Sequence, residues 1–173
     1  MFGRQYELVD CFSIERDGED KRFNPKKLGN KKLLWHGSRF SNYVGIIRQG
    51  LRIAPPEAPH NGYLSGKGIY FATNINLSFG YGCPHLSNNV GIYVLAEVAV
   101  GKSGPSDGYN TTEASMLKKG FNSTEWINES NLKTNKKVFG DVEVPFGSSS
   151  SQAYIVYNEN QVKLRYLVRI KQK

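Results

Sequence analysis

The chain has 173 residues, 39% of them hydrophobic and 12% aromatic, and carries a formal net charge of +8. This length and apolar content exclude an intrinsically disordered chain and fit a single domain, residues 1–173, with a real core. The lysines are dispersed in pairs such as Lys31-Lys32 and Lys118-Lys119, without a long basic run. The charge therefore fits an anionic partner or substrate and a merely solvated surface about equally well.

Membrane and metal chemistry find little support in the sequence. No run of residues approaches the length of a membrane span, and no apolar leader opens the chain. Cys11 and Cys83 have no metal-ligand spacing with each other or with the three histidines. We therefore expect an intracellular protein without a metal site.

Apolar and alternating runs predict the main strands, in chain order, at residues 6–13, 33–35, 69–72, 91–100, 142–145, 153–157 and 162–170. One short helix is predicted after the Ser-Asn pair at 41–42, ending at Gly50, and a second after Asn74. The rest is expected to be an extended piece at 51–53, a stiff proline loop at 54–61, a surface region with short elements at 102–137 and a flexible loop at 147–151. This pattern indicates an α+β domain dominated by antiparallel sheet rather than a Rossmann fold.

A short polar sequence follows the apolar run at residues 33–35. His36 is the one group there that titrates near neutral pH, and Gly37 allows a ligand to approach the backbone. Such a histidine is more often a packed residue than a ligand contact. On the second predicted helix, Ser78 and Tyr81 are three residues apart, so their hydroxyl groups share one face. Taken alone, this spacing also fits ordinary packing of Tyr81.

Several longer motifs occur together and in a fixed order. They are LWHGSR at residues 34–39, QGLRIAPPEAP at 49–59, GKGIYFA at 66–72, GDVEVP at 140–145 and YIVY at 154–157. In this order they resemble the catalytic domain of the poly(ADP-ribose) polymerases, above all the DNA-damage-responsive members, over essentially the whole chain. The resemblance implies an ADP-ribosyltransferase fold, with two packed antiparallel β-sheets, short helices and an NAD+ cleft. It also implies transfer of ADP-ribose from NAD+, as co-substrate, to protein acceptors, with release of nicotinamide.

The resemblance further implies a pocket for nicotinamide. The backbone of Gly37 and the hydroxyl group of Ser78 would bind the carboxamide. Tyr81 would stack on one face of the nicotinamide ring, and Tyr70 would cover the other. Inhibitors that mimic nicotinamide would bind in the same pocket.

The remaining part of NAD+ is assigned in the same way. The resemblance implies that His36, with Ser38 near it, holds the adenine-side ribose, and that Arg52 lies close to the adenosine and phosphates. The donor loop, residues 54–67, would lie over the dinucleotide, and Tyr63 within it would contact NAD+.

The catalytic position is where the chain departs from the family. Cleavage of the nicotinamide–ribose bond gives an oxocarbenium-like ribose. The reaction needs a carboxylate to hold the ribose hydroxyl and to polarise the hydroxyl of the acceptor. In the family this is a glutamate directly before the YIVY strand; here the position is Ala153, so the triad reads His36, Tyr70 and Ala153. Glu159 lies beyond the strand and is not a simple replacement. We expect NAD+ binding to survive and transfer to be strongly impaired. The alanine fits a natural inactive relative or an engineered knock-out, and the close match around it favours the second.

Other departures concern the product and its control. Leu77 stands where family members carry a lysine beside the acceptor site, and the loop at 147–152 looks shorter than theirs. Both departures argue against chain elongation. The choice between mono- and poly-ADP-ribosylation stays open. The chain begins where the catalytic fold begins, so we expect no helical autoinhibitory domain, no DNA-binding domain and no direct binding of DNA. We expect a monomer, nuclear if its source is eukaryotic.

Two alternatives to an impaired transferase stay open. The first is a natural pseudoenzyme that binds NAD+ or ADP-ribose for recognition. The second is a basic nucleic-acid-binding module, which rests on the net charge alone and predicts salt-sensitive affinity. It ranks lower because it gives no reason for the arrangement from His36 to Tyr81.

Overall fold

The computed structural model describes residues 5–23, 25–55, 64–127, 135–146 and 152–173. The strands are β1 (Tyr6–Ser13), β2 (Lys31–Gly37), β3 (Ile69–Ala72), β4 (Val90–Ala99), β5 (Ser103–Pro105), β6 (Ser123–Ile127), β7 (Asn135–Phe139), β8 (Val142–Phe146), β9 (Gln152–Val156) and β10 (Val162–Gln172). The helices are α1 (Glu19–Arg22), α2 (Pro25–Leu28), α3 (Tyr43–Gln49), α4 (Ile75–Phe79) and α5 (Glu113–Lys118), with 3-10 turns η1 (Phe40–Asn42), η2 (Gly80–Gly82), η3 (Pro84–Leu86), η4 (Gly108–Asn110) and η5 (Glu159–Gln161). None of the helices in the described ranges has the length and apolar character needed to span a membrane.

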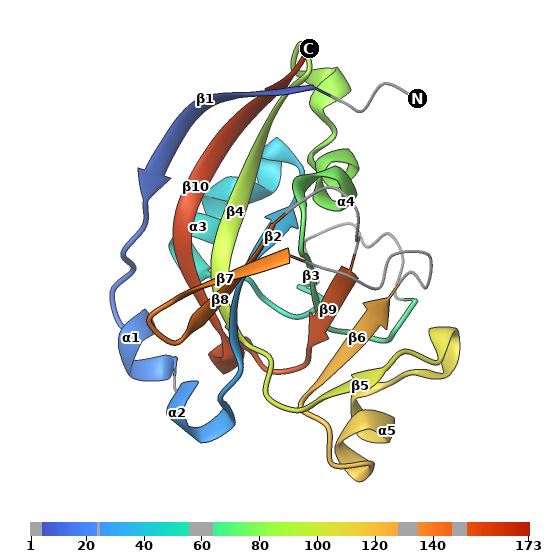
Figure 1. Ribbon diagram of the computed structural model, residues 1–173. Coiled ribbons are helices and arrows are strands. Elements are labelled where there is room, and N and C mark those ends of the chain that lie inside the picture. Colours follow the sequence, from blue (N-terminus) through green and yellow to red (C-terminus); the bar gives the residue numbers. More distant parts are fainter. Residues whose placement is uncertain (1–4, 24, 56–63, 128–134, 147–151) are drawn as a thin grey trace.

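The ten strands of the described ranges form one hydrogen-bonded network in the order β1-β10-β4-β2-β3-β9-β6-β5, and β8 pairs with both β2 and β7. Most neighbours are antiparallel; β2–β8 and β5–β6 are parallel. The two halves of the network meet at a narrow junction, where β2 and β3 pair through Trp35 and Ala72. Figure 1 shows the long strands β1, β10 and β4 on one side of this junction and β9, β6 and β5 on the other. The predicted α+β architecture of antiparallel sheet with short helices is confirmed.

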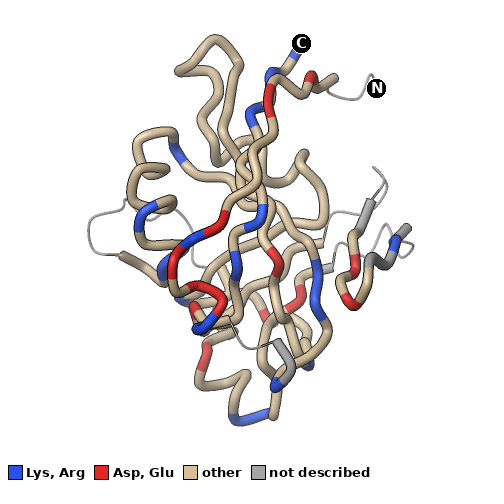
Figure 2. The backbone as a smooth tube through the Cα atoms, turned by 90° about the vertical axis from the view of Figure 1, so that its left-hand side faces the viewer, with Lys and Arg blue, Asp and Glu red and all other residues tan. Residues whose placement is uncertain are grey.

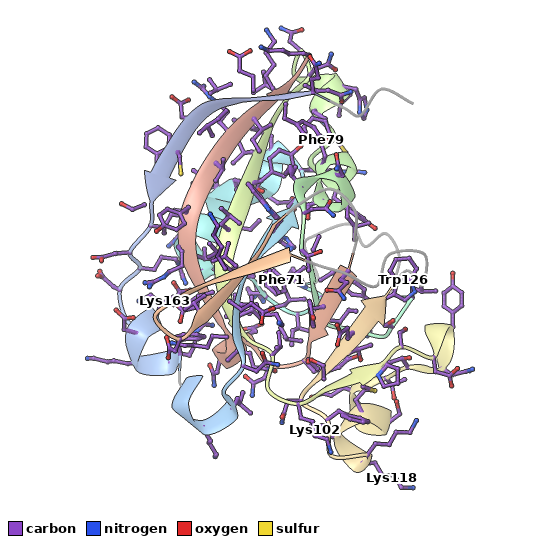
Figure 3. The ribbon with its side chains drawn as sticks, in the orientation of Figure 1. Phe71, Phe79, Lys102, Lys118, Trp126 and Lys163 are labelled. Carbon is purple, nitrogen blue, oxygen red and sulfur yellow. The ribbon has the colours of Figure 1, made fainter. Side chains whose placement is uncertain are left out.

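Both faces of the long strands are covered by core side chains. One core includes Leu34, Val94 and Leu164 and is closed by α3. The other contains Phe79, Tyr93, Val168 and Ile170. Figure 3 shows Phe79 of the second core on α4 and Phe71 of the first core nearer the middle of the molecule.

The predicted alternation of β10 holds, with one interruption. The pairing of β10 with β4 shifts between Leu164 and Tyr166, which is a β-bulge. The extra residue moves the side chains after it to the opposite face of the sheet. Leu164 therefore packs in the first core, whereas Val168 packs in the second. Tyr166, predicted to be inward-facing, is 40% exposed.

Helix α3 ends as the sequence predicts, but begins differently. Gly50 follows its last residue with φ = 84°, a conformation that favours glycine. Arg16 satisfies the helix end by donating to the carbonyl groups of Ile47 at 2.8 Å and Arg48 at 3.1 Å. The side chain of Asn42 does not cap the start of the helix, because it donates instead to Ser38 Oγ at 3.0 Å.

The prediction for residues 102–137 was wrong in one respect. This region contributes β6, which pairs with β9 inside the sheet, and the side chains of Ser123 and Thr124 are fully buried. Their polarity suggested a surface location. Ser123 Oγ donates to the Val100 carbonyl at 2.8 Å, and Thr124 Oγ1 lies 2.6 Å from the Tyr157 hydroxyl, so burial leaves neither hydroxyl unsatisfied.

The expected loops are less fully described. Residues 51–53 form no strand; Leu51 is buried, and the backbone N–H of Ile53 donates to Glu159 Oε1 at 2.9 Å. Most of the expected proline loop and the expected loop at 147–151 lie outside the described residues.

Candidate active site

A cavity of ≈680 Å³ lies at the junction of the two halves of the sheet. The end of β2, helices α3 and α4, strands β3, β6 and β9 and the turn η2 all contribute to its wall. The residues that were predicted from the sequence and that line it are His36, Gly37, Ser38, Arg52, Tyr70, Ser78, Tyr81 and Ala153. Tyr63, also predicted, lies outside the described residues. Residues far apart in the sequence thus meet at one cavity.

One end of the cavity presents backbone polar groups. The Ser78 hydroxyl donates to the Trp35 carbonyl at 3.3 Å, so this carbonyl points toward α4. Backbone groups two residues apart in a strand point to the same edge, and those of Gly37 therefore point the same way. A Cβ atom on Gly37 would lie 2.2 Å from the Ser78 carbonyl oxygen, which explains why glycine is required here. The phenol of Tyr81, 60% exposed, borders the same end.

His36 is held in one orientation by β3. Its Nδ1 donates to the Tyr70 carbonyl oxygen at 2.8 Å, and its ring lies 5.7 Å from that of Phe71. Burial lowers the pKa of His36, and the bond to the Tyr70 carbonyl opposes this effect. The neutral ring with its proton on Nδ1 keeps Nε2 as a hydrogen-bond acceptor, which suits a ligand hydroxyl group.

The hydroxyl group of Tyr70 is used to hold the chain before β3. It accepts from the backbone N–H of Ser65 at 3.0 Å and donates to the Gly66 carbonyl at 2.8 Å. The Tyr157 hydroxyl donates to the Ser65 carbonyl at 3.0 Å, and Ser65 Oγ lies 2.7 Å from Ser106 Oγ. Tyr70 also lines the cavity, so it connects the cavity wall to the chain before β3. Sequence reasoning missed Ser65, because Ser106 and Tyr157, two of its partners, lie 41 and 92 positions away.

The described lining of the cavity is positively charged. It contains Arg39 and Arg52, and no aspartate or glutamate. Arg52 Nη1 donates to Gln49 Oε1 at 3.0 Å, which places its guanidinium beside the end of α3. The arginines of the described lining favour an anionic ligand such as a pyrophosphate.

Ala153 occupies the floor of the cavity. It pairs with Ala72 of β3 on one side and with Trp126 of β6 on the other. Its side chain shares a face with Ile155, which also lines the cavity, whereas Tyr154 packs in the core. The position that the family resemblance gives to a carboxylate thus carries a methyl group. Trp126 was not predicted as a lining residue, since it reaches the cavity through strand register alone.

Glu125, beside Trp126 on β6, and Glu159, the acid nearest to Ala153 in the sequence, are both engaged elsewhere. Glu125 Oε1 accepts from the Tyr154 hydroxyl at 2.7 Å, on the core side of the sheet. Glu159 accepts from the Ile53 backbone and pairs with Arg22 at 3.7 Å. Neither residue lines the cavity, so neither supplies the missing carboxylate.

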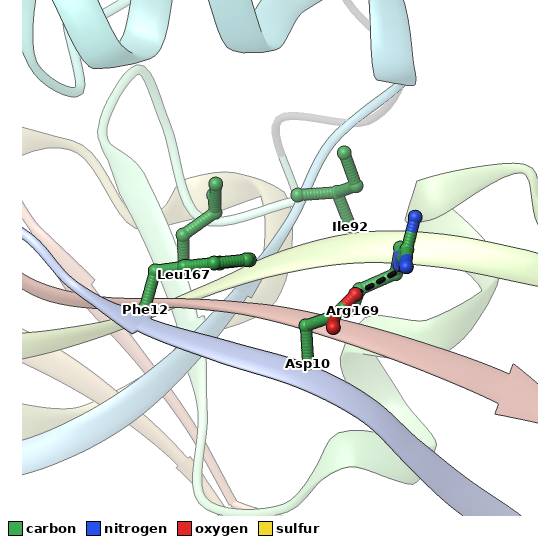
Figure 4. A pocket seen from close by; sticks show the side chains of 5 residues that line it. All are labelled: Asp10, Phe12, Ile92, Leu167 and Arg169. Atoms are coloured by element: carbon green, nitrogen blue, oxygen red, sulfur yellow. Dashed lines mark ion pairs between the residues drawn. The ribbon is translucent and has the colours of Figure 1, made fainter.

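A smaller hollow of ≈290 Å³ lies over β1, β10 and β4. Figure 4 shows the side chains of Phe12, Leu167 and Ile92 on the same side of these strands, with the Asp10–Arg169 ion pair beside them. The two charges neutralise each other, and the other lining residues are apolar. This hollow therefore offers less chemistry than the large cavity.

In the part of the chain that the structure describes, Lys and Arg are not gathered on one face (Figure 2). Figure 2 shows Lys and Arg interspersed with Asp and Glu along the chain. Several cations are paired within the described ranges; for example, Lys31 contacts Glu97 at 3.1 Å and Arg165 contacts Glu97 at 3.1 Å. This distribution differs from the basic stripe typical of a nucleic-acid module.

Comparison with known proteins agrees with the geometry. Residues 3–172 match the sequence model of the family described as the poly(ADP-ribose) polymerase catalytic domain. Similar proteins are poly [ADP-ribose] polymerase 1 of Arabidopsis thaliana (44% identical over 95% of the chain), poly [ADP-ribose] polymerase of Drosophila melanogaster (41% over 94%) and poly [ADP-ribose] polymerase 2 of Homo sapiens (40% over 94%). The matched part spans 18%, 18% and 30% of these relatives, respectively.

The strand arrangement and these matches identify the architecture as an ADP-ribosyltransferase fold. The chain belongs to the poly(ADP-ribose) polymerase catalytic-domain family. The family uses NAD+ as co-substrate. An anionic dinucleotide with a carboxamide fits the arginines of the cavity and the backbone polar groups of Gly37.

Proposed function

We propose that residues 1–173 form one NAD+-binding ADP-ribosyltransferase domain, whose transfer of ADP-ribose to protein acceptors is strongly impaired by Ala153. The observation that carries this proposal is the convergence of His36, Gly37, Tyr70 and Tyr81 on one cavity. All four residues line this cavity, although they come from β2, β3 and η2.

The nicotinamide end is assigned to Gly37, Ser78 and the two tyrosine rings. A primary carboxamide carries two N–H donors and one carbonyl acceptor. The backbone of Gly37 offers a matching acceptor and donor, and Ser78 offers a hydroxyl that can turn from the Trp35 carbonyl. The rings of Tyr70 and Tyr81 border the same space and would sandwich a flat heterocycle.

The ribose and pyrophosphate ends are assigned to the β2–α3 side. His36 Nε2 would accept from a ribose hydroxyl, with Ser38 nearby. Arg52 would interact with the phosphates as a charge-assisted donor. The donor loop that the resemblance assigns to residues 54–67, including Tyr63, would complete this end.

The impaired step is the stabilisation of the reacting ribose. NAD+, when bound, supplies a glycosidic bond whose nicotinamide leaves as a neutral group, so departure needs orientation more than a proton. What remains is a developing positive charge on the ribose and a proton to be drawn from the acceptor. The methyl group of Ala153 can neither stabilise this charge nor accept this proton. No carboxylate in the described lining takes the place of the family glutamate.

A pseudoenzyme that binds NAD+ or ADP-ribose is the second candidate. Leu77 and Trp126 favour it, because both line the cavity near Ala153 and neither carries a group for acceptor chemistry. The two candidates share the binding site and differ in whether a carboxylate at position 153 restores transfer.

A thermal unfolding experiment with benzamide tests the shared binding site. A ligand at 100 times its Kd stabilises the folded chain by about 2.7 kcal/mol, which raises Tm by about 5–10 °C in a chain of this size. We expect this shift in the parent and its loss in Gly37→Trp. Gly80→Trp is the matched control, because a Cβ at Gly80 meets no atom within 4 Å and Gly80 does not line the cavity. The absence of a shift in the parent at millimolar benzamide would contradict the assignment.

A further inference from the structure

One row of residues crosses the floor of the cavity from strand to strand. Ala72 of β3 pairs with Ala153 of β9, and Ala153 pairs with Trp126 of β6. Directly opposed residues of antiparallel strands place their side chains on the same face. All three line the cavity, so its floor runs from two methyl groups to a large indole.

The indole of Trp126 is open to a ligand. The Trp126 residue is 37% exposed, and Figure 3 shows it on β6, at the side of the molecule where β9 and β6 run together. Within the described ranges, its N–H donates to no protein group. An aromatic side chain that is one-third exposed leaves apolar surface in contact with water. A ligand that covers this surface is stabilised by the hydrophobic effect.

The surroundings of Trp126 are apolar in the described part of the lining. Leu77 of α4 adds a further apolar side chain to the wall, and Ala153 adds a methyl group. The charged lining residues, Arg39 and Arg52, come from the β2–α3 side. Glu125, the neighbour of Trp126, is turned to the core, where it binds Tyr154. Among the described residues of the lining, this end therefore offers neither a cation to an anionic ligand nor a carboxylate to a cationic one.

We propose that Ala72, Leu77, Trp126 and Ala153 form a ring subsite, which binds a flat, uncharged aromatic group of a ligand whose carboxamide occupies the nicotinamide end. The two alanines leave a recess beside the indole, and an aromatic ring seated there would stack on its face in the offset arrangement that aromatic pairs favour. The proposal rests on the proposed function, since it assumes that the carboxamide is held by Gly37. It assigns the selectivity of this end of the cavity to Trp126.

Binding of three sets of benzamides tests the ring subsite. Each set carries a linker of two to four atoms at the meta position, which ends in a phenyl ring, a carboxylate or an ammonium group. Calorimetry would give the ratio of the Kd of benzamide to that of each extended compound. We expect the best phenyl compound to bind at least tenfold tighter than benzamide, about 1.4 kcal/mol, and the charged compounds to gain less than threefold.

Variants of Trp126 connect the gain to the indole. Trp126→Ala should reduce the phenyl gain to below threefold, and Trp126→Phe should keep most of it, because a ring remains. Leu117→Ala is a control at an exposed leucine, 53% accessible and outside the cavity lining. Melting curves verify that each variant is folded, and the ratio of two Kd values cancels any general weakening of the amide pocket.

The outcomes separate the two proposals. If benzamide binds and the phenyl ring adds nothing, or adds as much in Trp126→Ala, the ring subsite is wrong and the amide pocket stands. A gain for the ammonium compounds that equals the phenyl gain would also overturn it, because the indole would then act through a cation–π interaction. If benzamide itself fails to bind, the amide pocket is wrong, and the ring subsite fails with it.

Discussion

The Nδ1 atom of His36 donates a hydrogen bond to the backbone carbonyl oxygen of Tyr70 over 2.8 Å. This bond joins β2 to β3 close to the Trp35–Ala72 pairing, where the two halves of the sheet meet. It fixes the ring of His36 and directs Nε2 away from β3. The observed structural contact and the proposed ligand contact thus depend on the same imidazole.

His36 should make the free energy of unfolding depend on pH. Burial lowers its pKa in the folded chain below the ordinary value of 6.5. As the pH falls, the unfolded chain therefore takes up this proton before the folded chain does. The contribution of neutral His36 is complete above the unfolded pKa and is lost as the pH falls through 6.5 toward the folded pKa, by at most about 1.4 kcal/mol per pH unit.

Urea unfolding of the parent and of His36→Gln, at about pH 7.5 and about pH 5.5, measures this contribution. All other residues are identical in the two proteins, so their contributions cancel in the difference. The parent should lose more stability on acidification than the variant. Parallel pH profiles would mean that burial does not disfavour the charged ring.

Gly37→Ala should lower stability and ligand binding together. The new methyl group would approach the Ser78 carbonyl oxygen to 2.2 Å, and a backbone atom cannot move aside without shifting α4. We expect a loss of about 1–3 kcal/mol in the free energy of unfolding, as for other overpacked sites. Gly45→Ala in α3 is the matched control, because its Cβ meets nothing within 4 Å and a helix interior favours alanine by roughly 0.5–1 kcal/mol. Equal effects of the two substitutions would argue against a close approach at Gly37.

Tyr70→Phe should separate the two roles of this residue. The ring stays, but the backbone N–H of Ser65, a residue that is 2% exposed, loses its acceptor, which costs about 1–3 kcal/mol. Thermal unfolding should therefore show a lower Tm, whereas saturating benzamide should still raise Tm. Tyr81→Phe, at a phenol with 60% exposure, should change Tm by much less. A Tyr70→Phe variant as stable as the parent would show that the hydroxyl does not hold residues 65–66.

The sequence predicts the fold best where the pattern is local. The runs at residues 6–13 and 69–72 give β1 and β3 with the predicted bounds, and Asn74 caps α4 by accepting from the Leu77 N–H. Ser123 and Thr124 read as surface residues, because the groups that satisfy their hydroxyls are 23 and 33 positions away. The bulge in β10 likewise depends on pairing with β4, which no pattern within β10 reveals.

The site follows the same rule. His36 and Gly37 belong to a motif that resembles a known family, Ala153 directly precedes another, and the same resemblance assigns Ser78; the structure places all four on one cavity. Trp126 belongs to no such motif. It reaches the cavity through the register of β6 with β9, and register is a property of two strands together.

The central claim is that Ala153 stands in an otherwise assembled active site. Ala153→Glu would place a carboxylate on the cavity floor, where it can accept from the reacting ribose and draw the proton of an acceptor. One such interaction with a transition state contributes roughly 3–4 kcal/mol, about two to three orders of magnitude in rate. Ground-state contacts with NAD+ lie mainly elsewhere, so the change should fall on kcat rather than on binding.

Nicotinamide release from NAD+ by the parent, Ala153→Glu and Ala153→Gln is the most direct measurement. Glutamine has the size of glutamate without its charge and controls for filling the floor of the cavity. We predict at least a hundredfold increase for Ala153→Glu, little change for Ala153→Gln, and similar Kd values of all three for a non-hydrolysable NAD+ analogue. A folded, analogue-binding Ala153→Glu variant that turns over no faster than the parent would contradict this account and favour the pseudoenzyme.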